Sequence, residues 1–171
     1  MREFIEKVEG EGELLRITAP VSTRFEITEI TDRISKMEGG GKAILFENTG
    51  TDYPVLMNSM GSDRRMAMAL GVEDLEDISR RIDNLLKGVM SPKDSLVDKL
   101  RMLPLLADVA KWFPRKSSGR GECQEVVWRG EDADLRRLPI LTSWAADGGP
   151  FITLPMVCTK DPETGIPNMG M

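Results

Sequence analysis

The sequence predicts an α+β fold, in which an N-terminal α/β domain over residues 1–116 is followed by the opening strands of a β-rich domain over residues 117–171. Three observations predict it. Amphipathic runs with helical spacing alternate with short apolar runs in the first part of the chain. A basic, Gly/Ser-rich stretch at residues 114–121 has the composition of a linker. Beyond it, a Gly-Gly-Pro turn, an apolar run and a second turn are typical of a β-hairpin.

The first part of the chain is expected to alternate helices and strands. Apolar side chains three or four residues apart indicate helices, and short apolar runs between turn residues indicate strands. In order, the expected elements are helix 2–8, strand 14–18, helix 25–37, strand 42–47, strand 53–58, helix 62–70, helix 74–87 and a helix from residue 91 that Pro104 kinks or breaks before it continues to Trp112. Glycines 39–41 end the second helix, and the turn residues 48–52 join the next two strands in a hairpin.

We expect this part to fold on its own around one hydrophobic core. The second and fourth helices carry apolar stripes, and the strand expected at residues 42–47 has the composition of a buried strand. The predicted core residues are Ile30, Ile34, Ile44, Leu45, Ile78, Ile82 and Leu85.

The second part is expected to be β-rich. Residues 124–128 and 151–159 predict strands, and Asp134 predicts the cap of a short turn. Pro155 lies inside the second strand and cannot donate a ladder hydrogen bond, so that strand is an edge or contains a bulge. The turn at residues 161–165 leads to a return strand that begins near Ile166. A hairpin with so short a return strand leaves backbone groups unpaired, so we expect further chain or a partner to complete the sheet.

Composition excludes several classes of protein. The net charge is −5 without a long basic stripe, which makes nucleic acid an unexpected partner. The absence of His removes His-based triads, and Cys123 and Cys158 make neither a disulfide framework nor a zinc site. The N-terminus lacks the apolar core of a signal peptide, and no apolar run is long enough to span a membrane. We expect a cytoplasmic protein.

Several residues near the end of the chain have two interpretations. Gly148 and Gly149 could let a ligand approach the backbone, but a turn before a strand is the more common use of such glycines. Asn168 could supply an amide oxygen to Mg²⁺ or Mn²⁺, although Asn after a turn is usually structural. Asp147, Asp161 and Glu163 could form an acidic cluster, but the last two are better explained as turn residues. The tryptophans 112, 128 and 144 are interpreted as core or interface anchors.

The combined pattern resembles the UbiD family of decarboxylases. The matching segments are DADLRRLPIL, GGPFITLPMVCTKDPETG and NMGM, which occur here in the family's order. The family's full motif continues beyond the last of these with Tyr-Arg. The resemblance extends over the whole chain but covers only about the first third of a typical member.

The resemblance implies an enzyme that reversibly removes carboxylate from aromatic or α,β-unsaturated acids. It implies prenylated FMN as cofactor, held with Mn²⁺ or Mg²⁺ and often K⁺ in a flavin-reductase-like split β-barrel. On this basis Asn168 is a metal ligand, the backbone at Met169 faces the monovalent cation, and Gly170 and Met171 contact the cofactor. The resemblance also implies a homo-oligomer.

The residues that complete the family's site are not among the 171 of this chain. The catalytic Glu-Arg-Glu network and the second carboxylate ligand would follow Met171, so we expect no catalytic residue and no bound cofactor here, and an inactive N-terminal portion. Two alternatives remain open from the sequence. One is a non-catalytic docking subunit that uses its α/β part to bind a partner. The other is a split-barrel protein that binds ordinary flavin without a metal.

Overall fold

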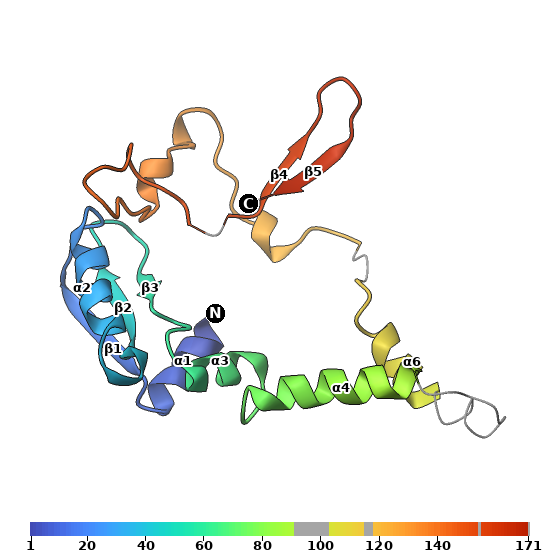
Figure 1. Cartoon of the computed structure of the whole chain (residues 1–171). Coiled ribbons are helices and arrows are strands. Elements are labelled where there is room, and N and C mark those ends of the chain that lie inside the picture. The colour runs from blue at the N-terminus through green and yellow to red at the C-terminus, as the bar shows by residue number, and fades with distance from the viewer. Residues whose placement is uncertain (91–102, 115–117, 154, 171) are drawn as a thin grey trace. The chain divides into compact units, whose positions relative to one another are not determined.

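The computed structural model describes residues 1–90, 103–114, 118–153 and 155–170, and within them the fold is mixed α/β with two small sheets (Figure 1). The chain divides into two compact units. The first unit comprises Met1–Arg65 together with Asp134–Met171, and the second comprises Met66–Ala133. The domain boundary after residue 116 stays a prediction.

A three-stranded sheet organises the first unit. Helix α1 (Arg2–Gly10) precedes strand β1 (Leu14–Pro20), which pairs in parallel with β2 (Ala43–Asn48). Helix α2 (Glu26–Ser35) and the short helix η1 (Glu38–Gly40) connect them. Strand β3 (Val55–Met57) pairs with β2 in the antiparallel sense, which confirms the predicted hairpin. Parallel pairing of β1 with β2 is what a strand–helix–strand crossover produces.

The core of this unit lies between α2 and the central strand. Val21, Ile27, Ile44 and Phe46 are buried, and the predicted core residues Ile30 and Ile34 pack against them. Ile44 and Leu45 are both buried, as expected. Leu141, from the distant C-terminal segment, also packs against this cluster. Leu141 was not among the core residues predicted from the sequence.

Replacing Leu141 with Ala should destabilise the chain by about 2 kcal/mol, because it leaves a cavity beside the core. The matched control is Leu135→Ala in the same segment, whose side chain is 65% exposed. Its loss should cost about 0.5 kcal/mol or less. Urea unfolding followed by circular dichroism measures both. Equal effects of the two changes would mean that Leu141 does not contribute to the core.

Helix α3 (Asp63–Leu70) begins as the sequence predicts and carries a buried charge. The Ser62 hydroxyl accepts a hydrogen bond from the Arg65 amide at 3.3 Å, as an N-cap does. The Arg65 side chain is fully buried and donates from Nη1 to Glu13 at 2.7 Å. Its Nε and Nη2 atoms have no hydrogen-bond partner among the described residues. The ion pair with Glu13 therefore connects α3 to the residue before β1.

The second unit is mainly helical and corrects two predictions. Helix α4 (Glu76–Met90) forms close to its predicted range, and α6 (Leu103–Ala110) has Pro104 in its first turn. Ile82 was predicted to be buried, but it is 51% exposed. An apolar stripe predicts that one face of a helix is buried, but it does not show which residues pack against that face. The start of the predicted helix at residue 91 lies outside the described residues.

The predicted strand at residues 124–128 is also wrong. The structure has the short helices η2 (Glu122–Gln124) and η3 (Gly130–Asp132) with no strand between them. Val126 and Val127 are 73% and 53% exposed, so their alternation has no sheet to pack on. None of the described helices is long and apolar enough to cross a membrane.

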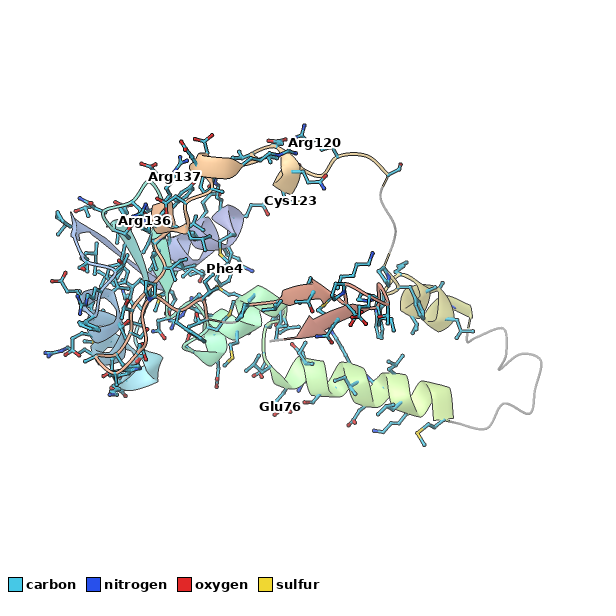
Figure 2. The ribbon with its side chains drawn as sticks, turned by 90° about the horizontal axis from the view of Figure 1, so that it is seen from above. Phe4, Glu76, Arg120, Cys123, Arg136 and Arg137 are labelled. Carbon is cyan, nitrogen blue, oxygen red and sulfur yellow. The ribbon has the colours of Figure 1, made fainter. Side chains whose placement is uncertain are left out.

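Asp134 caps the short helix η4 (Leu135–Arg137), as predicted. Its carboxylate accepts hydrogen bonds from the amide and the guanidinium of Arg136, both at 2.9 Å. Figure 2 labels the Arg136 side chain. The side-chain hydrogen bond from Arg136 is the main reason that the pKa of Asp134 falls to about 2. This turn directs the chain toward Leu141 and the core of the first unit.

The C-terminal hairpin is shorter than predicted. Strands β4 (Val157–Lys160) and β5 (Pro167–Gly170) pair in the antiparallel sense around the predicted turn. The expected strand from Phe151 begins only at Val157, because Pro155 has no amide hydrogen to donate and the amide of Phe151 bonds back to the Leu141 carbonyl at 2.9 Å. Every residue of both strands is exposed.

Candidate functional site

The residues predicted to hold a metal and a cofactor lie together on β5. Asn168 is opposite Thr159, Met169 opposite Cys158, and Gly170 opposite Val157. Side chains alternate along a strand, so Asn168 and Thr159 share one face of the hairpin, while Met169 and Cys158 share the other. Met171 lies outside the described residues.

The turn between β4 and β5 has a fixed geometry. The Asp161 carboxylate accepts hydrogen bonds from the amides of Glu163 and Thr164 at 2.9 and 2.6 Å, and from the Thr164 hydroxyl at 2.9 Å. The amide of Gly165 donates to the Asp161 carbonyl at 3.0 Å, with a φ of 71° at the glycine. Asp161 is therefore a turn residue, as the sequence analysis favoured, and the turn sets the register that places Asn168 opposite Thr159.

This turn should depend on pH. The backbone hydrogen bond from Thr164, followed by its hydroxyl, lowers the pKa of Asp161 below the ordinary carboxyl value. Because its pKa is lowered, the ionised Asp161 carboxylate stabilises the folded turn at every pH above the ordinary carboxyl pKa. This stabilisation is lost as the pH falls through the lowered pKa. Carboxyl-detected NMR should show Asp161 titrating below the ordinary range. Thr164→Val should move the titration upward, whereas an ordinary titration of Asp161 in the unchanged chain would contradict the geometry.

The chemistry of β5 matches one part of a metal site. An amide oxygen such as that of Asn168 is a suitable ligand for Mg²⁺ or Mn²⁺, which prefer oxygen donors. Such ions need several oxygens, and the described residues contain no group of three or more Asp, Glu, Cys or His side chains that could hold one. The donor type fits the metal, but further ligands have to come from elsewhere.

A second feature is a closed loop at residues 141–151. The hydrogen bond from the Phe151 amide to the Leu141 carbonyl joins its two ends. Inside the loop, the Asp147 carboxylate accepts hydrogen bonds from the amides of Ser143 and Trp144 at 3.2 and 2.9 Å. The Asp147 amide donates in turn to the Trp144 carbonyl at 3.1 Å. Asp147 therefore organises the loop and is not part of an acidic cluster.

This loop is attached to the start of α2 (Figure 1). The amide of Thr142 donates to the Thr23 carbonyl at 3.1 Å, and the Thr142 carbonyl accepts from the amide of Phe25 at 2.9 Å. The Ser143 hydroxyl lies 3.3 Å from that of Thr28, which is 115 residues away in the sequence. These bonds fix the loop beside the first turn of the helix.

Phe25 has an unusual backbone conformation at this junction. Its φ is 70° and its ψ is −38°, and the Glu26 amide donates to the Arg24 carbonyl across it at 2.9 Å. This is a γ-turn with positive φ, which is rare and strained for a residue with a side chain. The Arg24 guanidinium lies 5.0 Å from the centre of the Phe25 ring. Strain of this kind persists where surrounding contacts over-determine it, and it is concentrated at functional sites.

Three cavities open around this junction, and Trp144 lines all of them. The first, of about 340 Å³, lies between Trp144 and the residues of the first turn of α2. The second, of about 590 Å³, extends from Trp144 along the loop to Thr153. The third, of about 410 Å³, is lined by Arg24, Phe25 and residues of the loop that include Gly148 and Gly149.

This junction was not predicted from the sequence. Trp144 was interpreted as a core or interface anchor, but it is not a core residue because it is 62% exposed. Phe25 was predicted to begin a helix, but α2 begins at Glu26 and Phe25 is left-handed, a conformation that leaves no signal in its residue type. Arg24 was not singled out. The chain bends at Gly148 and Gly149, but the strand predicted to follow them directly begins only at Val157. An added Cβ at either glycine would meet no atom within 4 Å. Their backbone faces open space.

Comparison with known families gives two matches along the chain. Residues 5–83 match the 3-octaprenyl-4-hydroxybenzoate carboxy-lyase N-terminal domain, and residues 115–171 match the Rift-related domain of the same family. An uncharacterized protein from Aquifex aeolicus is 48% identical over the whole chain, which spans only 35% of that protein.

Two solved structures are similar to nearly the whole chain. One is an evolved dimeric form of the UbiD-class enzyme HmfF from Pelotomaculum thermopropionicum in complex with prFMN, with 28% identity and a TM-score of 0.59 over 98% of this chain and 34% of that one. The other is the closed form of vanillic acid decarboxylase from Sedimentibacter hydroxybenzoicus, with 27% identity and a TM-score of 0.65 over 95% of this chain and 31% of that one.

Proposed function

The chain belongs to the 3-octaprenyl-4-hydroxybenzoate carboxy-lyase (UbiD) family, and from this membership we propose that it forms the N-terminal part of a prenylated-FMN-dependent decarboxylase. The observation that carries the proposal is the similarity of 98% of the chain to an enzyme bound to prFMN. The chain spans about a third of the length of the relatives it matches, so the activity is proposed for the whole protein. Its substrates are aromatic or α,β-unsaturated acids, as the sequence resemblance implies.

The chemistry of decarboxylation supports a cofactor. Loss of carboxylate leaves electrons on carbon, and no side chain described here can accept them. A flavin-derived cofactor supplies that electron sink when it is bound. The protein binds and orients the cofactor and the substrate and excludes water from them. We expect this chain to help position the cofactor and not to supply catalytic residues.

We assign the positioning role to β5. The Asn168 amide oxygen would be one ligand of the Mn²⁺ or Mg²⁺ that holds the cofactor phosphate, the backbone of Met169 would face K⁺, and Gly170 and Met171 would contact the cofactor. The exposure of β5 on both faces leaves Asn168 accessible to such a group. The remaining oxygens, the catalytic Glu-Arg-Glu network and the substrate pocket would come from the rest of the whole protein.

The hairpin β4–β5 would be the opening of a flavin-reductase-like split barrel that begins near residue 117. Two exposed strands are too few for independent stability, which supports completion of the sheet by more chain. We also propose that the whole protein is a cytoplasmic homo-oligomer. One solved structure of the HmfF relative is of an evolved dimeric form.

The test is decarboxylation by a joined protein. Residues 1–171 are fused to the part of the Aquifex aeolicus relative beyond the matched 35%, and the product is supplied with prenylated FMN, Mn²⁺ and K⁺. CO₂ release is measured against a panel of aromatic and α,β-unsaturated acids. We expect release from at least one acid by the joined protein and none by the 171-residue chain alone. A folded, cofactor-loaded joined protein that releases no CO₂ from any of them would contradict the proposal.

A further inference from the structure

We infer that the cavity between Arg24, Trp144 and the Gly148–Gly149 turn is a binding site for a planar aromatic carboxylate. The cavity of about 410 Å³ is within the range of small-molecule pockets and is large enough for a single-ring acid. Its lining combines a guanidinium, aromatic surface and open glycine backbone. This combination recognises a molecule with both a ring and a negative charge.

The positive group at the site is Arg24. Its guanidinium lies over the Phe25 ring, and no hydrogen bond or ion pair from it to a carboxylate is found among the described residues. A guanidinium matches a carboxylate with two parallel hydrogen bonds, and it keeps its charge at all working pH values. Arg24 can therefore receive an anionic ligand without first breaking an ion pair.

The acidic groups nearby are already engaged. Asp147 accepts from two backbone amides of its own loop. Glu26 and Glu29 line the adjoining cavity, where Glu26 accepts from the Ser22 amide at 2.7 Å and Glu29 pairs with Arg33 at 2.6 Å. Their repulsion of an anion is reduced by these donors. Arg24 and Asp147 are the charged residues that line the 410 Å³ cavity, and the Asp147 carboxylate is the one already engaged by backbone amides.

The aromatic part of the ligand would lie against Trp144. This side chain is 62% exposed and lines all three cavities of the junction, so a flat ring can reach it. Stacking of a ring on indole contributes beyond simple burial of area. The glycine turn allows the ligand to approach the backbone closely, since no Cβ occupies that space.

The loop that forms the site is organised before any ligand binds. Hydrogen bonds close it at Leu141 and Phe151, brace it internally through Asp147, and attach it to α2 through Thr142. A site that is already ordered loses less entropy on binding. The strained γ-turn at Phe25 is part of the same framework. That the bound acid is a substrate of the enzyme, captured before it reaches the cofactor, rests on the proposed function; the binding itself does not.

The test is an NMR titration of the ¹⁵N-labelled 171-residue chain with sodium benzoate. Benzamide has the same ring without the charge, and acetate has the charge without the ring. We expect benzoate to shift the Trp144 indole and the Gly148 and Gly149 amides to saturation, and the other two probes to give no saturable shift. Saturation by acetate or benzamide, or none by benzoate, would overturn the inference.

Variants locate the charge. Arg24→Gln should weaken benzoate binding about 10-fold, which is the effect of losing one charge-assisted interaction. Arg24→Lys should retain most of the affinity, and the matched control Arg81→Gln on α4 should bind as the unchanged chain does. The Thr142 amide resonance reports whether the junction remains folded in each variant. Unchanged affinity in Arg24→Gln with an intact junction would contradict the site.

The two proposals can fail separately. Benzoate binding at Trp144 without CO₂ release by the loaded joined protein would leave this site standing and refute the proposed function. CO₂ release without saturable benzoate binding at Trp144 would support the proposed function and refute this site.

Discussion

Replacing Glu13 with Gln should destabilise the chain by about 3 kcal/mol, because it leaves the buried charge of Arg65 without its partner. The Arg65 side chain is fully buried, and its Nη1 donates to Glu13 at 2.7 Å. Two other nitrogens of the guanidinium have no partner among the described residues, so little else is available to compensate the charge. Gln has nearly the shape of Glu, which isolates the loss of charge from a loss of packing.

The matched control is Glu11→Gln, since Glu11 pairs with Arg64 on the exposed surface. That change should cost about 0.5 kcal/mol. The double variant Arg65→Met with Glu13→Leu should be more stable than Glu13→Gln alone, because it removes both charges and keeps apolar volume. Urea unfolding measures all of them. Equal midpoints for Glu11→Gln and Glu13→Gln would show that the buried ion pair is unimportant.

Replacing Asn168 with Ala should reduce Mn²⁺ affinity and CO₂ release by the joined protein about 100-fold. Loss of residues that only support a metal ligand already costs 10- to 100-fold, so loss of a direct ligand should reach about the upper value. Asn168 is exposed on β5 opposite Thr159, so the change should not disturb a core. Electron paramagnetic resonance of Mn²⁺ gives the affinity independently of turnover.

The control for this change is Asn84→Ala, an exposed amide on α4 far from the hairpin in sequence. It should leave both Mn²⁺ affinity and CO₂ release as they are. If Asn168→Ala binds Mn²⁺ as tightly as the unchanged joined protein, Asn168 is not a ligand, and the assignment of β5 as a metal-holding strand is wrong.

Local sequence signals predicted the first unit well. The range of β2 was correct to within about one residue because a run of four apolar residues between a glycine turn and an Asn-Thr-Gly turn has few other interpretations. Helix α2 was predicted from the spacing of Ile27, Ile30 and Ile34, and the structure places all three at the core. The Ser62 cap and the Asp161 turn were also predictable, since both depend on side chains that bond to the nearby backbone.

Contacts between distant residues could not be predicted this way. Leu141 joins the core and Ser143 contacts Thr28 through pairings that no spacing within the sequence encodes. The apolar stripe of α4 predicted that Ile82 is buried, and the alternation at residues 124–128 predicted a strand. Both patterns indicate an apolar face, but neither indicates which residues pack against it. The cavities around Trp144 depend on these same long-range contacts, so the sequence analysis missed them.

We propose that this chain carries one part of a cofactor site and that the rest of the whole protein supplies the other part. The most direct test is equilibrium dialysis of prenylated FMN with Mn²⁺ against the 171-residue chain and against the joined protein, with bound flavin measured by absorbance. We predict one cofactor bound per joined protein and none retained by the chain alone. Stoichiometric binding by the chain alone would contradict the claim.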